Sequence, residues 1–128
     1  MNTKINTIRV LIVDDSPQVR RDLRAILPLA ISEDGRAIQV VGEAENGRDA
    51  IVLIRTIHPD VVLLDLAMPV LDGWSAAQEI KAENPDIRVV ALSIHNNEGS
   101  RTRARQSGVD DFVVKGASLR EIIQAIAS

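Results

Sequence analysis

The stretch "DVVLLDLAMPVLDGW", residues 60–74, contains the pattern of a strand, a turn and the start of a helix. Residues 61–64 form a short uninterrupted apolar run, which is typical of a strand covered on both faces of a parallel sheet. The run ends on the carboxylate of Asp65, and Asp72-Gly73 then begins a helix. The stretch therefore predicts one βα unit with a carboxylate at the carboxyl end of its strand.

The same unit recurs on both sides of this stretch. Further apolar runs predict strands at residues 8–13, 38–44, 87–93 and 111–114. Helical spacing and capping residues predict helices at residues 17–30, 47–57, 73–83, 97–107 and 119–126. Parallel strands joined by right-handed crossovers need helices on both faces, so we expect an α/β fold with a doubly wound five-stranded parallel sheet.

Length and composition limit the kinds of protein this can be. The chain has 128 residues, so we expect a single domain over residues 1–128, with a flexible segment at residues 1–7. It has no cysteine, which excludes disulfides and a thiol nucleophile. A net charge of −3 gives no reason to expect direct nucleic-acid binding. Because no apolar stretch approaches about 18 residues, we expect a soluble, cytoplasmic protein that does not enter a membrane.

Polar side chains follow four of the predicted strands at the point where each strand ends. Asp14-Asp15, Asp65, Ser93 and Lys115 each come directly after an apolar run. Ligands of doubly wound sheets bind at the carboxyl ends of the strands, so these side chains should share one edge. Two carboxylates about 4 Å apart repel by about 4 kcal/mol at an effective dielectric constant of about 20. The cluster therefore needs a positive partner.

Two cations can meet that need, Lys115 and a divalent metal ion. Oxygen ligands without histidine or cysteine favour Mg²⁺. A carboxylate beside Mg²⁺, an ammonium and a hydroxyl is suited to phosphoryl transfer, with the carboxylate attacking in line. Asp65 stands alone on the central strand and is the natural nucleophile. The sequence therefore predicts an aspartyl phosphate at Asp65.

Four motifs along nearly the whole chain resemble the response regulator receiver domain, the phosphorylatable part of bacterial two-component signalling. They are "VDDSP", "VVLLDLAMPVLDG", "ALS" and "FVVKGAS", in the order of that family. The resemblance implies a flavodoxin-like (βα)5 fold with strand order 2-1-3-4-5. It also implies a signalling module that catalyses only its own phosphorylation and dephosphorylation, and that is not an enzyme acting on other substrates.

The same resemblance implies roles for the acidic residues. Asp65 is the phosphoacceptor. Mg²⁺ is bound by the side chains of Asp15 and Asp65 and by the backbone carbonyl of Ala67, with Asp14 close behind or acting through a water.

The resemblance also implies how phosphorylation is sensed. Lys115 pairs with the phosphate, and Ser93 is the switch hydroxyl that turns toward the phosphoryl group. Phe112 is the switch aromatic whose rotamer follows Ser93, although it can also be read as a core residue. Ile94 stands where a small residue is usual, so we expect it to crowd the entry to the site. His95 occupies a position that tunes dephosphorylation, but a lone exposed histidine is more often a solvated loop residue.

The implied phosphodonor and partner is a sensor histidine kinase. Phosphorylation is expected to switch the surface of residues 97–107, 111–114 and 119–126. This surface is expected to control an output in transcription and can also form a homodimer contact. Gly116 replaces a common cis-forming proline, and "KGAS" resembles receivers with a helix-turn-helix DNA-binding output. DNA would be reached only through such an output domain, outside this chain. The alternative is a freestanding receiver or adaptor that acts by protein–protein interaction.

Other classes agree less well with the sequence. An aspartyl-phosphatase enzyme usually has a second aspartate where Ala67 stands. A dinucleotide-binding domain would need a G-x-G-x-x-G motif after the first strand. An interaction module that no longer uses phosphate would not need the strand-end residues described above.

The predicted helix at residues 97–107 differs from the others because it has almost no apolar stripe. Ala104 is its sole aliphatic side chain, so this helix should be held weakly and move easily. Arg101, Arg103 and Arg105 are most simply a solvated charged face. The alternatives are a salt-bridged dimer contact or an inhibitory contact with an output domain. Trp74 is expected to pack at the start of the third helix.

Overall fold

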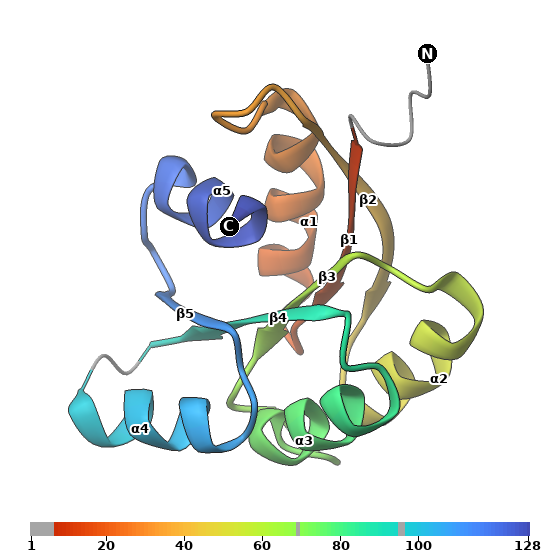
Figure 1. Ribbon diagram of the computed structural model, residues 1–128, viewed down its shortest axis with the longest axis vertical. Coiled ribbons are helices and arrows are strands. Elements are labelled where there is room, and N and C mark those ends of the chain that lie inside the picture. Colours follow the sequence, from red (N-terminus) through yellow and green to blue (C-terminus); the bar gives the residue numbers. More distant parts are fainter. Residues whose placement is uncertain (1–6, 69, 95–96) are drawn as a thin grey trace.

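The computed structural model of the protein describes residues 7–68, 70–94 and 97–128. Strands and helices alternate along the chain (Figure 1). The strands are β1 (Thr7–Val13), β2 (Ala37–Ala44), β3 (Val61–Asp65), β4 (Arg88–Ser93) and β5 (Asp111–Val114). The helices are α1 (Pro17–Ile26), the 3-10 helix η2 (Leu27–Leu29), α2 (Gly47–Ile57), α3 (Gly73–Glu83), α4 (Glu98–Gln106) and α5 (Leu119–Ala127).

The five strands form one parallel sheet in the order β2-β1-β3-β4-β5. α1 and α5 cover one face of this sheet, and α2, α3 and α4 cover the other (Figure 1). This arrangement confirms the predicted doubly wound, flavodoxin-like fold. The carboxyl ends of all five strands meet at one edge, which is where ligands bind in sheets of this type.

Successive residues of the central strands point into two different cores. Leu11 and Val62 pack with α2 and α3, whereas their neighbours Val10 and Leu63 pack with α1 and α5. All five residues of β3 are buried. A strand covered on both faces needs apolar side chains at nearly every position, which explains the uninterrupted run before Asp65.

The first helix ends earlier than predicted. We expected it to run to residue 30, but α1 ends at Ile26 and a 3-10 turn, Leu27–Leu29, follows. Pro28 accounts for the difference, because it has no N–H to donate to the preceding turn and its ring clashes with the carbonyl four residues earlier. As a result Ile26 is 37% exposed, while Leu27 is fully buried.

The start of the chain also differs from the prediction. Thr7, expected in a flexible segment, begins β1 and pairs with Ala37 of β2. Residues 1–6 of that segment lie outside the described residues. Among the helices that the structure describes, none has the length and hydrophobicity needed to span a bilayer.

Candidate functional site

The carboxyl edge of the sheet brings three carboxylates together. Asp14 and Asp15 directly follow β1, and Asp65 is the last residue of β3. One carboxylate oxygen from each residue lies within 4.8 Å of the others. Asp14 is fully buried and Asp65 is 2% exposed, whereas Asp15 is exposed to solvent. The acidic residues predicted to share this edge do so.

Backbone contacts hold Asp65 and the loop that follows it, the Asp65 loop (described residues 66–68 and 70–72). Asp65 Oδ1 accepts a hydrogen bond from the Ala67 amide at 3.0 Å, and the Leu66 carbonyl accepts one from the Gly73 amide at 3.2 Å. A Cβ on Gly73 would lie 2.4 Å from the carbonyl oxygen of Asp65 and 2.4 Å from the Cα of Leu66. Only glycine fits there, so the loop returns to β3 at a fixed point.

Similar contacts fix the loop after β1. The Asp14 amide donates to the Ala44 carbonyl of β2 at 3.1 Å, and Asp14 Oδ1 accepts from the Ser16 amide at 2.9 Å. Arg20 Nη1 donates to the Asp14 carbonyl at 2.6 Å. The Ser16 hydroxyl also caps α1 by accepting from the Val19 amide. Ser16 therefore joins the start of α1 to the acidic cluster.

Lys115 directly follows β5 and places its ammonium between two of the carboxylates. Its Nζ lies 2.9 Å from Asp14 Oδ2 and 3.2 Å from Asp65 Oδ2. Because an oxygen of Asp15 lies within 4.8 Å of these two carboxylates, the cluster holds three carboxylates and one ammonium. Among the described residues of this cluster, negative charge is therefore in excess.

Burial and neighbouring charges change the ionisation of the site. The pKa of Asp65 is raised to about 6, chiefly because burial disfavours the charged form, and also because Asp14 lies beside it. The Ala67 amide and the Lys115 ammonium oppose this rise. Burial alone would lower the pKa of Lys115, but the carboxylates of Asp14 and Asp65 raise it above its usual value. Lys115 therefore stays charged at neutral pH.

The cluster has the chemical composition of a Mg²⁺ site. Its side-chain donors are carboxylate oxygens, the ligands that Mg²⁺ prefers. Asp14 Oδ2 is buried without a hydrogen bond in the described part of the chain, and it relies on the ion pair with Lys115. A divalent cation would offset the excess charge that Lys115 leaves. The residues present therefore fit such an ion.

The two predicted switch residues lie on neighbouring strands. Ser93 ends β4 and is 7% exposed, and its carbonyl accepts a hydrogen bond from the Lys115 amide at 2.8 Å. Phe112 of β5 is half-buried and packs against the core under α2 and α3. Ile94 is exposed, and its crowding of the entry to the site stays a prediction. His95 lies outside the described residues.

Two backbone positions near the site have positive φ. Gly116 has a φ of 91°, in a turn that the Ala117 amide closes on the Val114 carbonyl at 3.0 Å. Glycine adopts this conformation without the steric cost that a side chain would bring. Val70 of the Asp65 loop has a φ of 72°, which is strained for a β-branched residue. Backbone strain of this kind is common beside functional sites.

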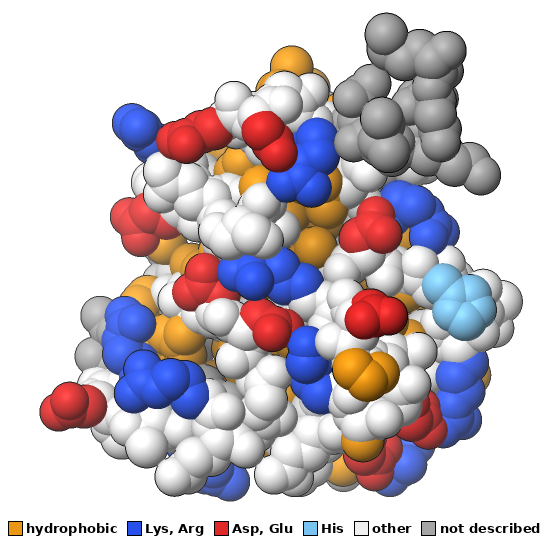
Figure 2. All heavy atoms as spheres, in the orientation of Figure 1, with side chains coloured by type: hydrophobic (Ala, Val, Ile, Leu, Met, Phe, Trp, Pro, Cys, Tyr) orange, Lys and Arg blue, Asp and Glu red, His pale blue; other side chains and the backbone are white. Residues whose placement is uncertain are grey.

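Ring contacts hold α4, which has no buried residue among its described side chains; the side chain of Ala104 lies outside them. The guanidinium of Arg101 lies 4.9 Å from the ring centroid of Phe112, and that of Arg103 lies 4.6 Å from the ring of Trp74. Figure 2 shows Lys and Arg side chains gathered over α4 at the lower left. Each ring contact contributes about 0.5–1 kcal/mol at an exposed site. Arg101 and Arg103 are therefore not simply a solvated charged face.

A second lysine–aspartate contact, not predicted from the sequence, lies at the opposite edge of the sheet. Lys81 Nζ donates to the carbonyls of Pro85 at 3.1 Å and Ile87 at 2.9 Å, and to Asp110 Oδ2 at 2.9 Å. Asp110 Oδ2 also accepts from the Val89 amide at 2.8 Å. These bonds join the end of α3 to the starts of β4 and β5. Nothing in this position marks it as a ligand site.

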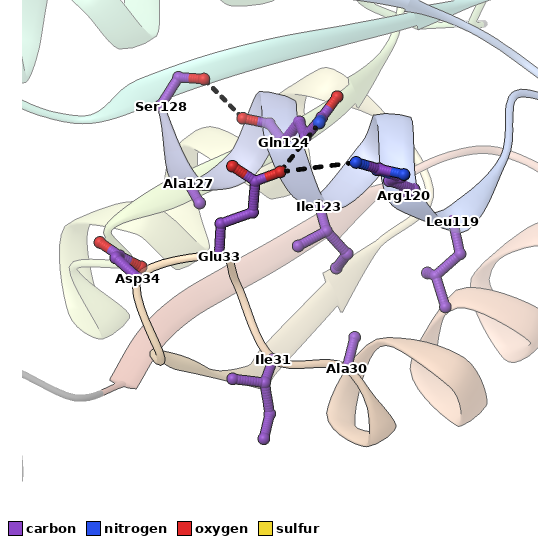
Figure 3. A pocket seen from close by; sticks show the side chains of 10 residues that line it. All are labelled: Ala30, Ile31, Glu33, Asp34, Leu119, Arg120, Ile123, Gln124, Ala127 and Ser128. Atoms are coloured by element: carbon purple, nitrogen blue, oxygen red, sulfur yellow. Dashed lines mark hydrogen bonds and ion pairs between the residues drawn. The ribbon is translucent and has the colours of Figure 1, made fainter.

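A hollow of about 870 Å³ lies away from the carboxylates, between α5 and the connection that precedes β2 (Figure 3). Glu33 reaches across it to Gln124 at 3.3 Å and to Arg120 at 4.0 Å. Ile31 and Ile123 supply apolar lining. None of the strand-end polar residues lines this hollow, so it has no part in the chemistry of the acidic edge.

The fold and the acidic edge together define a doubly wound domain whose ligands bind beyond the strand ends. Residues 10–127 match the response regulator receiver domain family. The chain belongs to this family, as its four motifs predicted, and is a receiver domain of two-component signalling.

Three relatives illustrate the match. The chain is 39% identical over 119 residues to the response regulator GacA of Pseudomonas aeruginosa, covering 93% of this chain and 53% of GacA. It is 26% identical to a DNA-binding response regulator of the LuxR family from Staphylococcus aureus, with a TM-score of 0.81 and coverage of 93% and 95%. It is 25% identical to a chain of the CheX-CheY-BeF3-Mg²⁺ complex from Borrelia burgdorferi, with a TM-score of 0.83 and coverage of 98% and 92%.

These relatives bear on the predicted subfamily. The likeness to DNA-binding response regulators agrees with the subfamily that "KGAS" predicted. The chain spans about half the length of the curated relatives it matches.

Proposed function

We propose that this chain is a phosphoacceptor switch, in which Asp65 takes a phosphoryl group from the phosphohistidine of a sensor histidine kinase. The observation that carries the proposal is the ammonium of Lys115, shared between Asp14 Oδ2 at 2.9 Å and Asp65 Oδ2 at 3.2 Å. A transferred phosphoryl group brings negative oxygens that need cations nearby. A buried carboxylate beside an ammonium and two further carboxylates suits that transfer.

In the transfer step, a carboxylate oxygen of Asp65 forms a bond to phosphorus as the bond from phosphorus to the kinase imidazole nitrogen breaks. The electron pair of the broken bond stays with the imidazole, and Asp65 becomes an aspartyl phosphate. The Ala67 amide orients the carboxylate through its hydrogen bond to Oδ1. Lys115 Nζ is already next to Asp65 and can pair with a phosphoryl oxygen.

The proposed metal ligands are the side chains of Asp15 and Asp65 and the backbone carbonyl of Ala67, with Asp14 close behind or acting through a water. When bound, Mg²⁺ neutralises charge on the phosphoryl oxygens. The excess of carboxylates over ammonium at this edge supports the assignment. We propose that the domain acts only on its own Asp65 and does not turn over other substrates.

The output of the switch is proposed by likeness to the family. Ser93 turns toward the phosphoryl group, Phe112 follows, and the surface of α4, β5 and α5 changes, either to form a homodimer contact or to release an output domain. Because GacA is about twice as long as the matched region, DNA would be reached through a part of the protein outside this chain. The cytoplasm is the proposed location. The alternative is a freestanding receiver that acts by protein–protein interaction.

Phosphorylation by a small donor tests the proposal. With Mg²⁺ and acetyl phosphate, we expect the intact protein to gain the mass of one phosphoryl group, and Asp65→Asn to gain none. Asp110→Asn, a matched change at the opposite edge of the sheet, should still be phosphorylated. Failure of the wild-type chain to gain the group, or full incorporation into Asp65→Asn, would overturn the assignment.

A further inference from the structure

The contacts of α4 single out one arginine. None of the described side chains of α4 is buried, and two of its guanidinium groups lie over aromatic rings. Arg101 lies over Phe112 of β5, the proposed switch aromatic. Arg103 lies over Trp74, at 4.6 Å from the ring centroid, and Trp74 belongs to a different part of the molecule.

Trp74 connects that contact to the acidic edge. It directly follows Gly73, whose amide donates to the Leu66 carbonyl and whose Cα packs against the backbone of Asp65. Trp74 is half-buried and packs against the core under α2 and α3. Gly73 therefore connects the Asp65 loop directly to Trp74. Among the described side chains of α4, Arg103 is the one whose guanidinium lies over this ring.

We propose that the contact between Arg103 and Trp74 ties α4 to the Asp65 loop in the unphosphorylated domain, and that switching breaks it. The inference rests on the proposed function, since it supplies a second route from Asp65 to α4 beside that of Ser93 and Phe112. Because each ring contact is weak, a ligand at Asp65 needs only a small free energy to shift α4 to an arrangement without this contact.

Coupling between two events is reciprocal: if a ligand at Asp65 breaks the contact between Arg103 and Trp74, then weakening that contact must favour binding of the ligand. Arg103→Met should therefore bind beryllofluoride with Mg²⁺ about two- to fivefold more tightly than wild type, the factor that corresponds to one exposed ring contact. A general charge effect has the opposite sign, because removing a positive charge weakens binding of an anion. Tighter binding is thus specific to loss of the contact.

Arg105→Met is the matched control. Arg105 lies on the same helix, is exposed and carries the same charge, and the described residues give it no ring contact. It should bind beryllofluoride no more tightly than wild type. Arg103→Lys keeps a cation near the ring and should lie between wild type and Arg103→Met.

Trp74 is the sole tryptophan of the chain, so its fluorescence reports the contact directly. Without ligand, Arg103→Met should change the emission and Arg105→Met should not. Beryllofluoride with Mg²⁺ should move the wild-type emission toward that of ligand-free Arg103→Met. The inference is overturned if Arg103→Met binds no more tightly than Arg105→Met, or if saturating ligand leaves the wild-type emission unchanged.

Calorimetry separates this inference from the proposed function. If the wild-type domain binds beryllofluoride with Mg²⁺ but Arg103→Met shows no gain, the coupling route is wrong and the phosphoacceptor assignment stands. If the wild-type domain binds no beryllofluoride, both fail. Urea unfolding of each variant verifies that the changes act on the switch and not on folding of the domain.

Discussion

Lys81 and Lys115 make similar contacts at opposite edges of one sheet, but their surroundings differ. Their side chains are 21% and 22% exposed, and each ammonium lies 2.9 Å from an aspartate oxygen. Lys81 also donates to two backbone carbonyls, and its partner Asp110 accepts from a backbone amide as well. Lys115 instead faces a second carboxylate, that of Asp65, with Asp15 close to both.

The difference shows what separates a structural ion pair from a ligand site. At the Lys81 edge, one carboxylate faces one ammonium, and backbone groups take up their other hydrogen bonds. At the Lys115 edge, three carboxylates cluster beside one ammonium, and a buried oxygen of Asp14 has no hydrogen bond in the described structure. The balance of charges and hydrogen bonds, and not the ion pair itself, marks the second edge as the site.

The largest expected effect is that an Asp→Asn substitution changes the free energy of unfolding in opposite directions at the two edges. Asp65→Asn removes a buried charge and should raise the free energy of unfolding by about 2 kcal/mol at neutral pH without Mg²⁺. Asp110→Asn removes the charged partner of Lys81 and should lower it by about 1–2 kcal/mol. Urea unfolding of the two variants measures the difference. Effects of the same sign would contradict the contrast between the edges.

The stabilisation by Asp65→Asn should also depend on pH. The pKa of Asp65 in the folded chain is about 6, above the ordinary aspartate value. As pH rises, the unfolded chain releases this proton first, so ionisation of Asp65 progressively destabilises the fold from about pH 4 to about pH 6, with a constant cost above. The gain in free energy of unfolding from Asp65→Asn should therefore be full near pH 7.5, above this pH range, and much smaller near pH 4.5, close to its lower end. An equal gain at both pH values would show that burial of the charge is not its cause.

A smaller effect separates the two lysines by metal affinity. Lys115→Met removes the cation that competes for Asp14 and Asp65, so Mg²⁺ should bind about tenfold more tightly. Lys81→Met should leave the affinity within about twofold of wild type, because its charge lies at the far edge. Titration calorimetry with Mg²⁺ tests both variants. Weaker binding by Lys115→Met would mean that the lysine organises the carboxylates more than it competes with the ion.

The parts of the site at strand ends could be predicted from the sequence. Asp65, Ser93 and Lys115 stand out because each is the first polar side chain after an apolar run, and parallel strands bring such positions to one edge. Lys81 and Asp110 give no comparable signal. They lie 29 positions apart in a helix and a loop that are both rich in polar residues, and only the packing of α3 against β4, the strand that pairs with β5, brings them together.

The remaining differences come from interactions that a periodic pattern does not represent. The helical spacing of apolar residues continues past Pro28, but the missing N–H of that proline ends α1. The pairing of β1 with β2 shifts register between Val10 and Leu11, whose partners are Val40 and Gly42. Gly42 was the available signal, because a glycine inside a strand often marks a bulge. The contact between Arg103 and Trp74 has no signal of its own in the sequence.

The close approach of Gly73 to the backbone of Asp65 and Leu66 bears on how related sequences are classified. The need for glycine at this position comes from the path of the main chain and not from phosphate chemistry. A descendant that has lost its acceptor aspartate should therefore retain the glycine, since losing it would break the loop. A homologue with the glycine but without the aspartate would then keep the fold of the receiver domain while having lost the phosphoacceptor. Loss of signalling would thus appear in a sequence at the position of Asp65, and loss of the fold at the position of Gly73, eight residues later.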